Sequence, residues 1–197
     1  MVYLWCCTGI RVENSKSINN RVSLLSGIIT TVATGFHSQA CVGNVFIDCE
    51  AGGMQAANDD DSVASGFKLT GGEYQSSILN CTSEGNGDLY RAGLGYGFFI
   101  AKDTSDGPVR FCRISNCSAI GNSSSSSSGG IGFYDDSSTT TNCLYTDNFG
   151  FGNVGASTTD NYNITVSPGT FNEIEADIGG ILDLANKPNY YNVSITS

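Results

Sequence analysis

The chain has 197 residues, of which 19 are acidic and 9 are basic, so its formal net charge at pH 7 is −10. Proteins that bind nucleic acid or anionic membrane surfaces need clustered Lys and Arg, and this composition argues against both partners. No stretch approaches the roughly 20 apolar residues that cross a bilayer, and the apolar start lacks the basic residues of a signal peptide. Long runs of helix-favouring residues are absent, which predicts a chain of strands and turns.

The first predicted strands lie in two short apolar segments, residues 9–14 and 26–36. From there a Gly-aromatic pair recurs, beginning at Gly35, Gly66, Gly97 and Gly132, with spacings of 31, 31 and 35 residues. After each pair and a loop of variable length, an apolar segment ends in a cysteine. These cysteines are Cys49, Cys81, Cys117 and Cys143. A period of 20–50 residues is the signature of a solenoid, array or propeller.

A second motif, Asn-Cys-x-x-x-x-Asn, occurs three times. Its paired asparagines are Asn80 and Asn86, Asn116 and Asn122, and Asn142 and Asn148. If the chain is a solenoid, equivalent residues of successive coils lie above one another. We therefore expect the cysteines to form a buried stack and the asparagines to form amide ladders at the bends, where Asn tolerates left-handed backbone geometry.

The apolar runs are too short for helical repeats, and Gly, Asn, Ser and Asp bound them as they bound strands. A unit of about 31 residues is also too short for a four-stranded propeller blade. The Gly-aromatic and apolar-Asn-Cys strands with Gly-Asn turns resemble right-handed parallel β-helix proteins of the pectin-lyase-like superfamily, over residues 9–155. The resemblance implies an all-β, right-handed parallel β-helix of about five coils, and it points to no single family.

The C-terminal part departs from the repeat. Thr170 and Glu173 have the spacing of a capping box, which predicts a helix that starts there and continues to residue 185. Strand-like segments flank it at residues 162–166 and 191–196. We therefore predict a strand–helix–strand cap, with a β-helix over residues 1–160 and a capping or assembly segment over residues 161–197.

Candidate metal and catalytic residues are few. The cysteines lack the CxxC pairs of zinc sites, and His37 is the only histidine, so we assign no metal or cofactor site. Acidic pairs and runs could hold calcium or sugar, but such loops are more often simply solvated. These acidic residues are Asp59, Asp60, Asp61, Asp135 and Asp136.

The enzyme interpretation depends on motifs that this chain lacks. Polygalacturonase-like members of the superfamily carry Gly-His-Gly and Arg-x-Lys, and neither occurs here. A polysaccharide-cleaving site would need carboxylates from neighbouring coils to converge with Lys102, Arg110 or Arg113. Aromatic residues could line a sugar-binding groove, although strand alternation turns about half of them inward. These aromatic residues are Phe98, Phe99, Phe133 and Tyr134.

Two further expectations concern single side chains. Cys6 and Cys7 are adjacent in a predicted strand, so their side chains point to opposite faces and one of them is exposed. Five Asn-x-Ser/Thr sequons occur, and we expect Asn122, at the edge of a serine-rich loop, to be the accessible acceptor. The sequons begin at Asn80, Asn116, Asn122, Asn163 and Asn192.

The pattern favours a non-catalytic structural β-helix in a surface, fibre or appendage protein outside the cell. Its expected partners are further copies of itself or another protein. The alternative is a polysaccharide-binding or polysaccharide-cleaving β-helix, lyase-like or hydrolase-like, with polysaccharide as the ligand.

Overall fold

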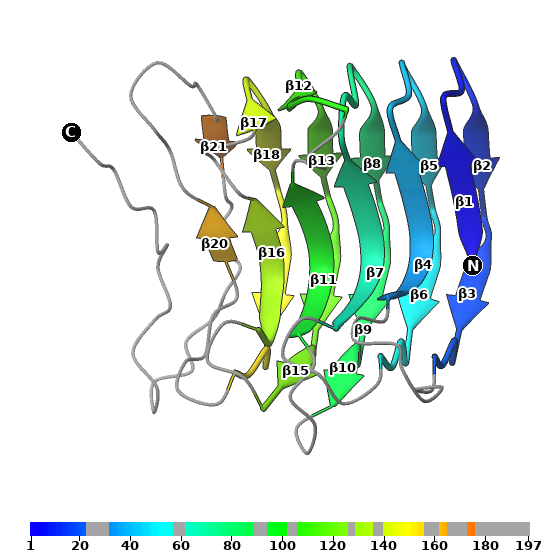
Figure 1. Cartoon of the computed structure of the whole chain (residues 1–197). Coiled ribbons are helices and arrows are strands. Elements are labelled where there is room, and N and C mark those ends of the chain that lie inside the picture. The colour runs from blue at the N-terminus through cyan, green and yellow to red at the C-terminus, as the bar shows by residue number, and fades with distance from the viewer. Residues whose placement is uncertain are drawn as a thin grey trace.

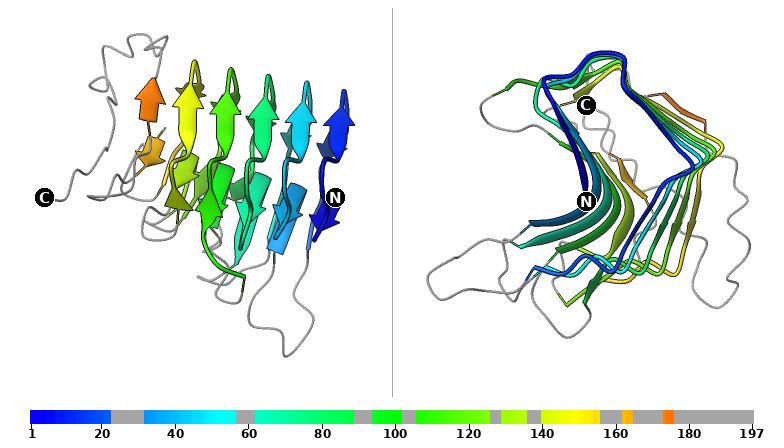
Figure 2. Two further views of the ribbon diagram at one scale, coloured as in Figure 1. Left: turned by 90° about the horizontal axis from the view of Figure 1, so that it is seen from above. Right: turned by 90° about the vertical axis from the view of Figure 1, so that its right-hand side faces the viewer.

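The computed structural model describes residues 1–22, 32–56, 62–88, 94–101, 106–125, 129–135, 140–155, 162–164 and 173–175. Successive coils lie side by side, and each complete coil adds one strand to each of three parallel sheets (Figure 1). Seen from the N-terminal end, the chain runs clockwise as it moves away from the viewer, so the helix is right-handed (Figure 2). The expected all-β parallel β-helix is confirmed.

The three sheets are named here in the order in which each coil visits them. Sheet I has six strands: β1 (Val2–Trp5), β4 (Val32–Gln39), β7 (Val63–Thr70), β11 (Leu94–Ala101), β16 (Ile131–Asp135) and β20 (Tyr162–Ile164). Sheet II has six strands: β2 (Arg11–Glu13), β5 (Val45–Ile47), β8 (Ser77–Leu79), β13 (Arg113–Ser115), β18 (Leu144–Thr146) and β21 (Glu173–Glu175). Sheet III has five strands: β3 (Lys16–Ile18), β6 (Glu50–Gly52), β9 (Thr82–Glu84), β14 (Ser118–Ile120) and β19 (Phe149–Phe151). Two short pairs complete the coils: β10 (Gly87–Asp88) with β15 (Ser123–Ser124), and β12 (Val109–Arg110) with β17 (Thr140–Thr141).

The aromatic residues of the Gly-aromatic pairs form the central column of the core. Phe36, Phe67, Phe98 and Phe133 are register partners and are fully buried. Their rings stack in parallel, with centroids 5.0, 5.0 and 4.8 Å apart. This distance is close to the spacing of neighbouring strands, so the pairing that joins the coils also sets the ring contacts.

The glycines of these pairs let sheet I approach sheet III. A Cβ on Gly66 would lie 2.0 Å from Ser83 Oγ, and a Cβ on Gly97 would lie 2.9 Å from the Cβ of Ala119. Only residues without a side chain fit where the two sheets meet. The end-on view shows the consequence, because sheet I bows into the coil and its outer face is concave (Figure 2).

Each coil turns through left-handed corners, which explains the abundance of Gly, Asn and Asp. Positive-φ residues form three corner columns that run along the helix, and a further set, which includes Cys6, Ala40, Gly72 and Gly107, follows the sheet I strands. The first contains Gly9, Gly43, Gln75, Phe111 and Asn142. The second contains Asn14, Asp48, Asn80, Asn116 and Asp147. The third contains Asn19, Gly53, Gly85, Gly121 and Gly152.

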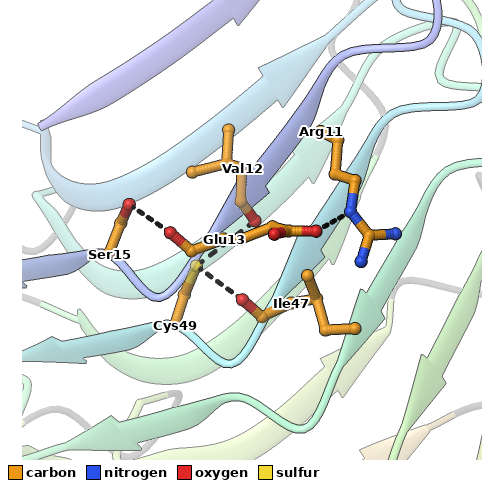
Figure 3. Close-up of polar contacts among 6 residues, drawn as sticks. All are labelled: Arg11, Val12, Glu13, Ser15, Ile47 and Cys49. Atoms are coloured by element: carbon orange, nitrogen blue, oxygen red, sulfur yellow. Dashed lines mark hydrogen bonds and ion pairs between the residues drawn. The ribbon is translucent and has the colours of Figure 1, made fainter.

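A buried cysteine follows each of Asp48, Asn80 and Asn116 in the second corner column, and its thiol donates to nearby carbonyl groups. The Cys49 thiol donates to the carbonyl of Ile47, at 3.2 Å, and to that of Val12 in the preceding coil, at 3.5 Å (Figure 3). Cys81 and Cys117 repeat this arrangement one and two coils further on. All three are buried, so the expected inward cysteine stack is confirmed. The Ile47 carbonyl also accepts from the backbone N–H of Asn14 at 3.1 Å, so the thiol is an additional, weaker donor to a carbonyl that is already bonded.

The third copy of the Asn-Cys motif occupies a different corner from the first two. Cys143 stacks on Cys112, and the residue that stacks on Cys117 is Asn148. Treating Cys143 as the continuation of the Cys49–Cys81–Cys117 line is therefore wrong. The reason is that two corners of each coil need the same local chemistry, a left-handed residue followed by a small buried one. The motif therefore predicts a corner of the coil, but it does not predict which of the corners it forms.

The asparagines form two ladders. At the corner surface, Asn116 Nδ2 donates to Asn80 Oδ1 at 2.8 Å. Inside the coil, the amides of Asn86, Asn122 and Asn153 bond in series with two distances of 2.7 Å. Asn122 is 0% exposed, so the expectation that it is the accessible sequon is wrong. Its side-chain amide forms hydrogen bonds with Asn86 and Asn153, which lie in the coils on either side.

Beyond residue 160 the structure describes two strands. β20 adds to sheet I beside β16, and β21 adds to sheet II beside β18. The prediction of a helix starting at Thr170 is thus wrong for Glu173–Glu175. These residues are extended and pair with the otherwise open edge of β18. The rest of that helix and the strand at 191–196 lie outside the described residues. The division at residue 160 remains a prediction. Within the described ranges no helix is long and apolar enough to cross a membrane.

Candidate functional site

The outer face of sheet I carries a continuous column of large side chains, one from each of five successive coils. Its members follow the Gly-aromatic pair directly in four of the coils. The outer column consists of Tyr3, His37, Lys68, Phe99 and Tyr134. Alternation explains its position, because the residue next to an inward phenylalanine points outward. Phe99 and Tyr134 are only partly buried, in contrast to Phe98 and Phe133.

Three of the four steps along the outer column are side-chain contacts, and at the fourth step His37 and Lys68 are register partners. The ring centroids of Tyr3 and His37 are 4.9 Å apart. The ammonium group of Lys68 lies 5.5 Å from the centroid of the Phe99 ring, in a cation–π contact. Phe99 stacks on Tyr134 with centroids 5.3 Å apart and planes 11° apart. The column is therefore a strip of rings and one cation along the concave face.

Tyr96, which is only 3% exposed, packs against this strip. Its ring lies 4.9 Å from Phe99 and 5.1 Å from Tyr134, measured between centroids. Burial, with a smaller effect from Tyr134, raises the pKa of Tyr96 above its ordinary value of 10.0. Its hydroxyl group therefore stays protonated at neutral pH and remains a hydrogen-bond donor.

Polar groups lie along one side of the outer column. Tyr3 donates to Gln39 Oε1 at 2.8 Å, and Gln39 Nε2 donates to Asp106 Oδ2 at 2.8 Å. His37 Nε2 lies 2.7 Å from Thr70 Oγ1. Burial, and then the charge of Lys68, lowers the pKa of His37 to about 3. His37 is therefore a neutral hydrogen-bonding group at ordinary pH and a weak base.

The structure does not bring the candidate carboxylates and cations together on this face. Asp135 is 1% exposed and accepts a hydrogen bond from the hydroxyl of Tyr145 inside the coil. Burial, followed by the charge of Asp135, raises the pKa of Tyr145. Arg110 and Arg113 are exposed, before and at the start of sheet II. The remaining candidates, Asp59, Asp60, Asp61, Asp136 and Lys102, lie outside the described residues.

A second buried carboxylate, on Glu73, was missed by sequence reasoning. It is 0% exposed and accepts hydrogen bonds from Ser38 Oγ at 2.7 Å and from the Cys41 backbone N–H at 3.0 Å. It therefore satisfies polar groups at a corner, facing the core. Glu73 follows Gly71-Gly72 in a segment without an Asn-Cys motif, so the repeat pattern held no signal for it.

The cysteines and acidic residues do not assemble into a metal site in the part of the chain that the structure describes. All eight cysteines are free. Cys6 is exposed and Cys7 is partly buried, so the expected exposure of one of them is confirmed, although Cys6 lies at a left-handed corner after β1 and not in a strand. A hydrogen bond with Cys117, together with burial, raises the pKa of the Cys81 thiol. The buried thiols are thus packing and hydrogen-bonding groups.

Comparison with protein-family models, curated proteins and solved structures found no match to this chain. The parallel β-helix architecture is shown by the structure itself. The chemistry of the site must therefore be argued from its own side chains.

Proposed function

We propose that the chain is a non-catalytic β-helix module of a surface or appendage protein outside the cell, and that its outer column binds polysaccharide. The observation that carries this proposal is the column of register partners from Tyr3 to Tyr134 along the concave outer face of sheet I, in which three of the four steps are ring or cation–π contacts. We also propose that the chain belongs to the pectin-lyase-like superfamily, on the strength of its repeat pattern.

The chemistry of the outer column suits sugar rings. Phe99 and Tyr134 present partly exposed apolar ring surfaces, on which the C–H faces of a sugar can pack. Gln39 and Asp106 place an amide and a carboxylate group alongside, and such groups fix the orientation of a ligand. Because the coils repeat about every 4.8 Å, the column offers similar contacts at regular intervals. A polymer of repeating units is the ligand that gains most from this regularity.

The buried positions of Asp135 and Glu73 support the absence of catalysis. General acid–base cleavage of a glycosidic bond needs two carboxyl groups a few ångströms apart across the bound sugar. Asp106 is the described carboxylate that lies beside the outer column, where Gln39 binds it. His37 is a poor base because its pKa is lowered to about 3.

Glycan-array binding, followed by calorimetry on the best ligand, tests the proposal. Phe99→Ala and Tyr134→Ala are each expected to weaken binding about fivefold or more, since each removes a stacking surface worth roughly 1 kcal/mol or more. Phe151→Ala is the matched control, because Phe151 is 54% exposed on sheet III, away from the column. An affinity that is unchanged in the Phe99 and Tyr134 variants, or no binding to any glycan, would overturn the binding proposal. Release of oligosaccharides from a bound polysaccharide, with or without calcium, would overturn its non-catalytic part.

A further inference from the structure

A second surface, separate from the outer column, exposes aromatic and apolar side chains at the corner between sheets I and II. Phe111 is 48% exposed, Val42 is 41% exposed and Tyr74 is 38% exposed. The rings of Tyr74 and Phe111 make an edge-to-face contact with centroids 5.5 Å apart. Val42, Tyr74 and Arg110 are β-bridge partners in successive coils, so this Phe111 corner runs along the helix axis.

The backbone of Phe111 is unusual for so bulky a residue. Its φ is +55°, and the other members of its corner column are Gly9, Gly43, Gln75 and Asn142. Glycine and asparagine adopt this geometry readily, whereas phenylalanine adopts it at a cost. Burial does not compensate, because about half of the side chain is exposed. Strained positions that folding does not require are characteristic of functional sites.

The charge of this corner is opposite to that of the protein as a whole. Arg110 and Arg113 are both exposed and flank Phe111. The two ion pairs among the described residues use Arg11 and Lys16, so neither arginine belongs to them. On a chain with a net charge of −10, the Phe111 corner is a local cationic and apolar patch that fits an acidic surface.

The chain itself provides an exposed carboxylate, that of Asp48, at the opposite end of the sheet II strands, beside the Lys16–Glu50 ion pair. A shallow depression of about 440 Å³ lies there, lined by Asn14, Lys16, Asp48, Cys49, Glu50, Asn80 and Thr82. Asp48 and Asn80 are exposed members of the second corner column. This Asp48 corner and the Phe111 corner belong to the same coils, so their side chains repeat with the same spacing along the axis.

We propose that the Phe111 corner of one chain docks on the Asp48 corner of a second copy, with the two β-helices lying side by side. Arg110 then faces Asp48, and the Phe111 ring enters the depression. The two corners are different surfaces, so the contact is heterologous and leaves one free corner on each partner. Further copies add in the same way, and the small apolar area makes each contact weak and dependent on concentration and salt.

Sedimentation equilibrium over a wide concentration range, at low and high salt, tests the proposal. The average mass of the wild-type chain is expected to rise with concentration at low salt and to fall towards the monomer at high salt. Arg110→Glu and Asp48→Lys alone are each expected to be monomeric. Mixed together, each variant offers the other a corner of complementary charge, at the native contact and at the charge-reversed one, so the mixture is expected to associate although neither variant does so alone. A wild-type chain that remains monomeric throughout, or a mixture that does not dimerise, would refute the proposal.

Phe111→Asn separates association from folding. The variant is expected to remain monomeric while its Tm rises by about 2–4 °C, because asparagine relieves the strained backbone. Gln75→Asn is the matched control, since it changes the neighbouring rung of the same corner column without removing a ring. This control is expected to associate like the wild type. Normal association of Phe111→Asn would contradict the assignment of the ring to the interface, whatever its Tm.

Discussion

Phe98 and Phe99 are adjacent in the sequence and lie on opposite faces of β11. The Phe98 ring stacks on Phe133 inside the coil, with centroids 4.8 Å apart and planes 3° apart. The Phe99 ring stacks on Tyr134 outside the coil, with centroids 5.3 Å apart. One stack holds neighbouring coils together, and the other forms part of the proposed binding face.

Replacing each phenylalanine by alanine should separate these two roles. Phe98→Ala is expected to lower the free energy of unfolding by about 3–5 kcal/mol, because it leaves a cavity in a fully packed column. Phe99→Ala is expected to change it by less than about 1 kcal/mol, since its ring is partly exposed. Urea unfolding measures both values. Equal losses would mean that the outer stack contributes to stability as the inner one does.

The close approach of sheets I and III predicts a steric clash at Gly66. Gly66→Ala would place a Cβ 2.0 Å from Ser83 Oγ, and we expect a loss of about 2 kcal/mol in unfolding free energy. Gly85→Ala is the control, because Gly85 has φ +63° and nothing within 4 Å of its Cβ position. That variant reports backbone strain alone, about 1 kcal/mol. In a double-mutant cycle, Ser83→Gly should recover part of the Gly66→Ala loss. Strict additivity would rule out the clash.

The buried amide ladder should be more important for stability than the exposed one. Asn122→Ala removes an acceptor from the backbone N–H and side-chain amide of Asn86, and a donor to Asn153. Since those buried groups lose their partners, we expect a loss of about 3 kcal/mol. Asn116→Gly, which keeps the left-handed corner and deletes the exposed amide pair, is expected to cost less than about 1 kcal/mol. Chemical denaturation compares the two, and similar costs would count against a structural role for the inner ladder.

Acid should destabilise the fold partly through His37. Its pKa is lowered to about 3 in the folded chain from an ordinary value of 6.5, so the unfolded chain binds a proton more readily between these values. The stability contributed by neutral His37 is complete above about pH 6.5 and falls by about 1 kcal/mol per pH unit below it, until the pH approaches 3. Tyr3, Thr70 and Lys68 are the side chains around it. Unfolding measured from pH 7 to pH 4 should show a smaller decline in His37→Gln, and parallel curves would contradict this assignment.

Thiol labelling should distinguish the cysteines. In the folded chain, Cys6 is exposed and is expected to react quickly with a thiol reagent, whereas the buried cysteines react slowly. A hydrogen bond with Cys143, together with burial, raises the pKa of Cys112, and burial raises the pKa of Cys49. All eight thiols should react quickly in denaturant. Mass spectrometry after timed labelling checks the order. Fast labelling of Cys81 or Cys117 in the folded chain would argue against the buried stack.

The local motifs predicted the corners well and their order along the coil poorly. Asn80-Cys81 and Asn142-Cys143 satisfy the same requirement, a left-handed residue before a small buried one, yet they occupy different corners. A similar ambiguity affected Asn122, which has a sequon and a neighbouring serine loop but lies inside the coil. The residues around a single corner do not predict which corner of the coil they form. The assignment depends on the number of residues between that corner and the equivalent corner of the preceding coil.

The sequence by itself determined the repeat: the glycines where two sheets meet, the inward phenylalanines, and the Gly, Asn and Asp residues at the corners. These features follow from local sterics and strand alternation, which act on neighbouring residues. Only the tertiary structure decided which residues share a column. It joined Lys68 to Phe99 on the outer face, placed Asp135 against Tyr145 in the core, and brought Tyr74 beside Phe111. Such contacts form between coils some thirty residues apart, and they depend on the register in which one coil pairs with the next.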